Sequence, residues 1–182
     1  MITRKKILTA SLITIFTLAG VSLAQVAAQE NLSDRHLGQI RDNCISAQNT
    51  LTQLHTSDAL LRVNRGQLYE STSTKLMTRF NTRVANNGFN NEALVSITDS
   101  YERTLDAFRA SYKSYEEQLA SALGIDCSKN PANFYDVVSS ARTKRSQVHS
   151  DIIRLNRYIT DYQEAVEKLE SDIKTANGSV RE

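Results

Sequence analysis

Apolar residues recur at alternating spacings of four and three residues throughout the last third of the chain. The pattern runs from Phe134 to Ile173, and Arg145 is its one charged interruption. Such a repeat is typical of a helix that buries one narrow stripe against partner helices, because the first and fourth positions of successive heptads face the same side. Pro131 suits the first turn of a helix, where no backbone N–H is needed. The sequence therefore predicts a long coiled-coil helix over residues 131–176.

Two further helices are predicted before this one. Between Leu94 and Leu119, apolar and aromatic residues keep the same spacing, which indicates a helix over residues 92–123. The preceding segment has no proline, but its apolar stripe changes phase in the manner of a stutter. We predict one long helix over residues 33–86, with a break near residues 55–59 as the alternative.

The connections between the predicted helices are short. The first, residues 86–91, reads NNGFNN, in which glycine and asparagine tolerate positive φ. The second begins at Gly124, which suits the end of a helix. Short loops make neighbouring helices antiparallel. We therefore predict an all-α fold, an elongated antiparallel three-helix coiled-coil bundle running up, down and up, which forms a single domain over residues 29–182.

The start of the chain has the three parts of a secretory signal peptide. The basic stretch MITRKK precedes an apolar run that ends in small residues. We predict a signal peptide over residues 1–28, cleaved after Ala28 or, alternatively, after Ala24. An uncleaved anchor is the competing interpretation, but the run contains threonine and serine and is shorter than the roughly 20 residues that a membrane span prefers. The mature protein is expected to be periplasmic, associated with the cell envelope or secreted, without stable membrane insertion.

Charge gives no reason to expect a nucleic acid as partner. Cleavage removes three of the 22 basic residues and none of the 20 acidic ones, so the mature chain is close to neutral. One basic-leaning segment remains over residues 62–83, with Glu70 as its one acidic residue. This segment either faces an acidic polymer or is a solvated helix face, and the second interpretation is the more common one.

The two cysteines, Cys44 and Cys127, are predicted to form a disulfide. Helical rise places Cys44 about 63 Å from the NNGFNN turn. A helix ending at Leu123, followed by four extended residues, places Cys127 about 60 Å from the same turn. The two sulfurs are thus expected at the same level, and an exported chain favours oxidation. Free or intermolecular thiols are the alternative.

The sequence contains no motif of a catalytic site. His36, His55 and His149 are isolated, and no H-E-x-x-H, G-x-S-x-G, phosphate-binding or dinucleotide-binding pattern occurs. The sequence HSD at residues 149–151 lies on a predicted helix, where consecutive side chains point in different directions. We expect a protein that is not an enzyme and that uses no cofactor or metal.

Three classes of function remain. The first is a structural or protein-binding coiled-coil module of the cell envelope. The second is a holdase chaperone, since an exported chain with long helical arms resembles the Skp/OmpH-like periplasmic chaperones in outline. That resemblance covers shape alone, because the strands and the strongly basic arms of that family have no counterpart here. The third is a secreted effector or adhesin.

The position of each residue along the bundle can be counted from the helical rise and the two connections, and this count also predicts a contact for Arg145. The count puts Arg145 beside Glu70 of the first helix. A charge in an apolar stripe often specifies the register of a bundle, so we predict an ion pair between these residues. The alternative is an arginine that extends its charge into solvent.

The same count predicts that both ends of the bundle have unpaired helix. Tyr162 is placed opposite the NNGFNN turn, so residues 163–176 should project by about 20 Å. The projecting stripe contains Val166, Leu169 and Ile173, and at the opposite end Leu37 and Ile40 precede Cys44 in the same way. Exposed apolar stripes attract partners. We predict that these residues bind another protein or a second copy of the chain, as a weak antiparallel homodimer.

Overall fold

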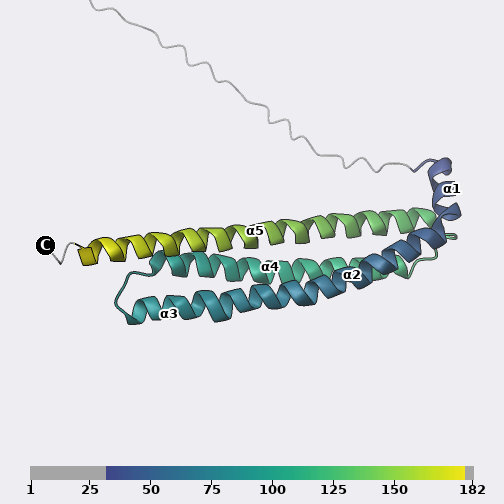
Figure 1. The fold of residues 1–182 in the computed structure, drawn as a ribbon. Coiled ribbons are helices and arrows are strands. Elements are labelled where there is room, and N and C mark those ends of the chain that lie inside the picture. The colour runs from purple at the N-terminus through teal and green to yellow at the C-terminus, as the bar shows by residue number, and fades with distance from the viewer. Residues whose placement is uncertain (1–31, 179–182) are drawn as a thin grey trace, which may run out of the picture. The chain divides into compact units, whose positions relative to one another are not determined.

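The computed structural model describes residues 32–178, and every regular element within them is helical (Figure 1). The predicted signal peptide, residues 1–28, lies outside these residues. The prediction of an all-helical bundle is confirmed. The elements are α1 (Asp34–Asp42), α2 (Cys44–Ser71), the π-helix η1 (Thr72–Met77), α3 (Thr78–Asn86), α4 (Glu92–Leu123) and α5 (Pro131–Gly178).

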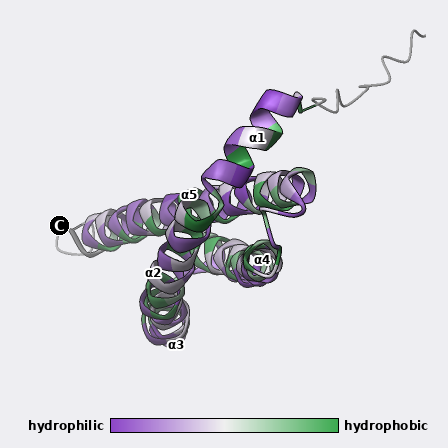
Figure 2. Cartoon of the chain, turned by 90° about the vertical axis from the view of Figure 1, so that its right-hand side faces the viewer, coloured by the Kyte–Doolittle hydropathy of each residue, from purple (hydrophilic) through white to green (hydrophobic). Residues whose placement is uncertain are grey.

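The first predicted helix, residues 33–86, is interrupted in the structure, although not near residues 55–59. The break lies at Asn43, whose φ of −104° and ψ of 10° leave the helical region. The side-chain Nδ2 of Asn43 donates a hydrogen bond to the carbonyl oxygen of Gln39 at 2.8 Å, which satisfies an acceptor at the end of α1. In both views α1 consequently runs across the direction of the long helices (Figure 1 and Figure 2).

The second interruption is the π-helix η1, which accounts for the change of phase in the apolar stripe. A π-helical turn holds one residue more than an α-helical turn. Tyr69 and Met77 are both buried although they are eight residues apart, whereas Leu68 and Leu76, each one residue earlier, are 58% and 57% exposed. The phase change is therefore accommodated by a local bulge and not by a change of supercoil.

The core lies along α4, which packs against both α5 and the α2–α3 segment. Its aromatic residues are buried as core, as their helical spacing indicates. The rings of Tyr69 and Phe108 meet edge to face at 5.7 Å between centroids, and those of Tyr112 and Tyr115 do so at 5.9 Å. These contacts join α2 to α4 and stiffen α4 itself. The buried residues contributed by α5 are Pro131, Phe134, Ala141, Val148, Asp151, Leu155 and Tyr162.

Polar contacts of buried tyrosines connect the helices. The hydroxyl of Tyr101 donates a hydrogen bond to the carbonyl oxygen of Tyr69 at 3.0 Å. The hydroxyl of Tyr162 lies 2.7 Å from Oδ1 of Asn81 and 3.2 Å from the carbonyl oxygen of Met77. These hydrogen bonds fix the positions of α4 and α5 along the bundle relative to the segment that runs from α2 to α3.

Raising the pH from about 10 to about 12 is expected to destabilise the bundle. Burial raises the pKa of Tyr101 and Tyr162 from 10.0 to about 12. Unfolded tyrosines lose their protons near pH 10 while the folded ones keep theirs, so the unfolded state is favoured as the pH rises through this interval. The stability that the two phenols provide is present below pH 10 and is lost towards pH 12. Circular dichroism followed together with phenolate absorbance measures this effect, and phenols that all ionise near pH 10 in the folded state would contradict it.

Candidate functional site

Two of the three predicted partner-binding residues of α5, Leu169 and Ile173, line a groove at one end of the bundle, and Val166 lies next to it. Val166, Leu169 and Ile173 are half-buried, and the first two pack against the core. A cavity of about 410 Å³ lies between this part of α5 and the α3–α4 connection. We call it the end groove and define it by Phe89, Ala93, Leu169 and Ile173.

The expectation that residues 163–176 project beyond the hairpin is wrong for most of that segment. Tyr162 contacts Met77 and Asn81 and does not lie opposite the NNGFNN turn. The turn and the start of α4 instead lie beside residues 165–176 of α5. The stripe is therefore covered on one side and open on the other.

The predicted overhang before Cys44 is also corrected. Because the chain bends at Asn43, Ile40 packs against the cluster formed by the two cysteines and Phe134. Leu37 is half-buried on α1, which contacts α5. Leu37 and Ile40 thus do not continue the line of α2, and they form no projecting seam.

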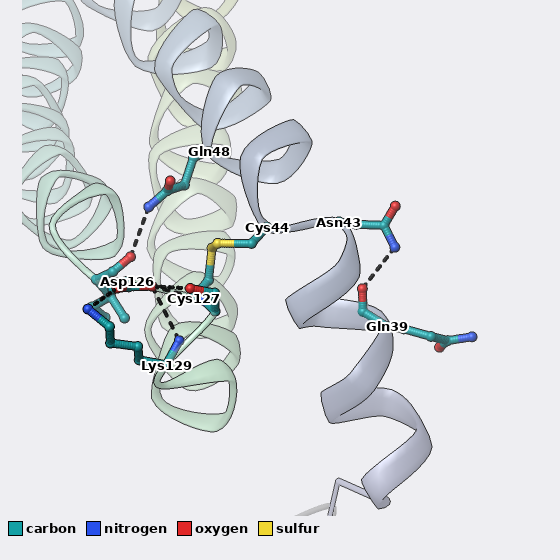
Figure 3. Close-up of a disulfide and its surroundings, with 9 residues drawn as sticks. Gln39, Asn43, Cys44, Gln48, Asp126, Cys127 and Lys129 are labelled. Carbon is teal, nitrogen blue, oxygen red and sulfur yellow. Dashed lines mark hydrogen bonds and ion pairs between the residues drawn. A yellow bond between two sulfur atoms is a disulfide. The ribbon is translucent and has the colours of Figure 1, made fainter.

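The structure joins Cys44 and Cys127, in agreement with the predicted pairing (Figure 3). Their Cα atoms are 5.5 Å apart, and both residues are buried. Beside the bridge, Nε2 of Gln48 donates a hydrogen bond to the carbonyl oxygen of Ile125 at 2.9 Å. The carboxylate of Asp126 accepts hydrogen bonds from the backbone N–H groups after it, which shapes the connection that holds Cys127. The bridge fastens the start of α2 to the α4–α5 connection.

Arg145 forms an ion pair, but its partner is Asp58 and not Glu70. Nε of Arg145 lies 3.0 Å from Oδ2 of Asp58, and its terminal nitrogen lies 3.3 Å from Oδ1. The hydroxyl of Tyr115 donates to the same Oδ2 at 2.8 Å, and Asp58 is 6% exposed. Glu70 pairs with Arg109 of α4 instead. Burial, together with the hydrogen bond to Asp58, raises the pKa of the Tyr115 phenol.

The error in level arises largely at the α4–α5 connection. The predicted contact of Arg145 with Glu70 requires Leu123 and Pro131 to lie at the same level. Nζ of Lys144 donates to Oγ of Ser114 at 2.6 Å, although Ser114 is nine residues before Leu123 and Lys144 is thirteen after Pro131. The connection therefore extends along the bundle by about one helical turn before α5 turns back. Each residue of α5 consequently contacts a part of α2 that is nearer the start of α2 than the sequence predicts.

A second cavity, which the sequence analysis did not predict, lies between α2, α4 and α5. Its volume is about 400 Å³. Its floor is apolar and aromatic, and its rim has arginines from two helices that are far apart in the chain. We call it the arginine pocket and define it by Arg62, Arg65, Arg142, Arg145, Phe108 and Tyr112.

The four arginines of this pocket differ in their partners. Arg62 pairs with Glu116 at 2.9 Å, and its guanidinium lies 5.2 Å from the ring centroid of Tyr112. Arg145 is held by Asp58. Among the described residues, no ion pair or hydrogen bond holds the side chain of Arg65 or Arg142. The pocket thus has two anchored and two unpaired cations.

The signal for half of this pocket was present in the sequence. Arg62 and Arg65 belong to the basic-leaning segment 62–83, for which the sequence leaves two interpretations, a face for an acidic polymer or a solvated helix face. The contribution of Arg142 from α5 depends on the level at which α5 meets α2. That level could not be counted correctly from the sequence.

The described part of the chain was also compared with the requirements of metal sites, membrane spans and known families. Within residues 32–178 no group of three or more His, Cys, Asp or Glu side chains is placed to hold a metal ion. None of the helices in the same range is both long and apolar enough to cross a membrane. Comparison with known proteins gives no match to a family model, to a curated protein or to a solved structure.

Proposed function

We propose that this chain is exported by its N-terminal signal peptide and acts as a non-enzymatic, protein-binding module of the cell envelope. In this proposal the three long helical segments form an up-down-up coiled coil whose end groove docks a helix of a partner or of a second copy. The disulfide supports the exported location, because such bridges persist in oxidising compartments.

The observation that carries the proposal is the half-open apolar stripe of the end groove. Val166, Leu169 and Ile173 are spaced by three and four residues, which is how one helix presents a seam to another, and the last two of them line the groove. Phe89, 42% exposed, forms the facing wall. Lys168 and Asp172 pair with each other at 3.0 Å on the rim, so the groove has an apolar centre and a charged edge. This arrangement is typical of interaction sites.

The geometry favours a second copy as the first partner to test. A two-fold axis can bring two identical stripes together in antiparallel orientation, so that each apolar residue covers its counterpart. The groove is small, and the resulting dimer is therefore expected to be weak.

Sedimentation of the mature protein over a range of concentrations tests this proposal. The native chain is expected to self-associate, and Ile173→Asp is expected to abolish the association. Ile45→Asp is the matched control, since Ile45 is 76% exposed on α2 beside the disulfide and lies outside the groove. Circular dichroism establishes that both variants are folded. A chain that is monomeric at every concentration, and whose Val166→Asp, Leu169→Asp double variant captures the same envelope proteins as the native chain, would falsify the proposal.

One observation favours the holdase chaperone as a second candidate. Large apolar side chains of α2 are exposed although they lie outside the end groove, and surfaces of this kind bind unfolded chains. Suppression of the aggregation of a denatured client protein tests this candidate. The exposed residues are Ile45, Leu60, Leu61, Val63 and Leu68.

A further inference from the structure

The arginine pocket has the composition of a site for a small amphiphilic anion. Its volume of about 400 Å³ lies in the range of sites that enclose small ligands. Phe108, Tyr112, Val148 and Ile152 offer it apolar surface from α4 and α5. A ligand with an apolar body can displace water from this surface.

The charges around the pocket favour an acidic head group on that ligand. Asp58, the one carboxylate among residues 32–178 that lines the cavity, already accepts hydrogen bonds from Arg145 and Tyr115. Arg65 on α2 and Arg142 on α5 are unpaired within the described residues and line the same cavity. Two guanidinium groups approaching from two helices can bind a carboxylate or a phosphate through charge-assisted hydrogen bonds.

We propose that the arginine pocket binds a small amphiphile, namely an apolar chain with a carboxylate or phosphate head. The apolar chain lies along Phe108, Tyr112 and Val148, and the head lies between Arg65 and Arg142. This site is separate from the end groove and does not depend on the partner proposed for it.

An extended acidic polymer fits the pocket less well than an amphiphile does. A polymer would leave the aromatic floor unused, and it would approach Glu116, which lies beside the rim and pairs with Arg62. The unpaired cations also flank a half-open apolar surface and do not form a long basic track. These features match a ligand that has one charged end and one apolar body.

Calorimetric titration of the mature, oxidised protein tests the proposal with four probes below their micellar concentrations. The probes share one alkyl chain and differ in the head: dodecanoate, dodecyl phosphate, dodecanol and dodecyltrimethylammonium. We expect one anion to bind per chain, with affinity for the alcohol and the cation lower by at least about tenfold. Binding of dodecanoate alone would identify a fatty-acid-type ligand, and binding of dodecyl phosphate alone would identify a phospholipid-type ligand.

The Arg65→Gln, Arg142→Gln double variant is expected to lose at least about tenfold in affinity for the bound anion. Both arginines are exposed and unpaired, so the fold should be unaffected. Arg79→Gln, Arg83→Gln is the matched control, since it removes the same charge from exposed positions of α3 outside the pocket. The proposal is overturned if dodecanol binds as well as dodecanoate, if the two double variants bind alike, or if polyglutamate binds while neither anionic amphiphile does.

Discussion

Reduction of the bridge between Cys44 and Cys127 is expected to lower the free energy of unfolding by about 4 to 5 kcal/mol. The bridge closes a loop with a sequence separation of 83, and loss of chain entropy in the unfolded state stabilises a loop of this size by that amount. For a chain of this length the melting temperature is expected to fall by about 10 to 20 °C.

Thermal unfolding of the mature protein with and without reductant measures this effect. The Cys44→Ala, Cys127→Ala variant should have the same melting temperature as the reduced native chain. Reductant should not change the melting temperature of this variant. If the oxidised and reduced chains melt at the same temperature, the bridge does not restrain the unfolded state. Two titratable thiols in the native exported protein would contradict the pairing itself.

Replacing Arg145 by leucine is expected to cost about 2 kcal/mol of stability, or about 4 to 8 °C in melting temperature. The variant leaves the buried carboxylate of Asp58 with the Tyr115 hydroxyl as its remaining polar partner. Removal of one partner from a fully buried pair costs more than this, but the side chain of Arg145 is 52% exposed, and solvent screens part of the loss. The measurement is chemical denaturation of both chains.

A double-mutant cycle distinguishes an ion pair between Arg145 and Asp58 from an Arg145 side chain that only extends into solvent. Arg145→Leu combined with Asp58→Leu should be less destabilising than the sum of the single variants, whereas Arg145→Leu with Glu70→Gln should be additive. Arg142→Leu is the matched control, because Arg142 is exposed three residues earlier on the same helix and has no ionic partner in the described range. A stabilised Arg145→Leu chain would contradict the pairing.

The parts of the fold that could be predicted are those in which one periodicity persists. The stripes of α4 and α5 keep the heptad spacing for many turns, so their buried faces could be assigned from the residues alone. The bends could not be predicted in this way. Asn43 breaks the first segment through a side-chain hydrogen bond to its own helix, and asparagine is tolerated inside many helices.

The position of each helix along the bundle relative to its neighbours depends on the geometry of the connecting loops. The spacing of residues in the sequence does not encode that geometry. The count was accurate enough to match Cys44 with Cys127, because the path between them crosses the NNGFNN turn but does not continue into α5. It failed for Arg145, where the extension of the α4–α5 connection and the π-helical bulge of the first segment both shift the register. The arginine pocket was missed for the same reason, since its two walls meet at a level that could not be counted.

The bridge also determines which parts of the bundle would carry a mechanical load. A pull applied between residues 32 and 178 passes along α1 to Cys44, crosses the disulfide to Cys127 and continues through α5. The covalent loop from α2 to α4 lies outside this path and cannot be drawn out while the bridge is intact. A partner held in the end groove would load α5 directly, whereas the walls of the arginine pocket on α2 and α4 would remain under no tension.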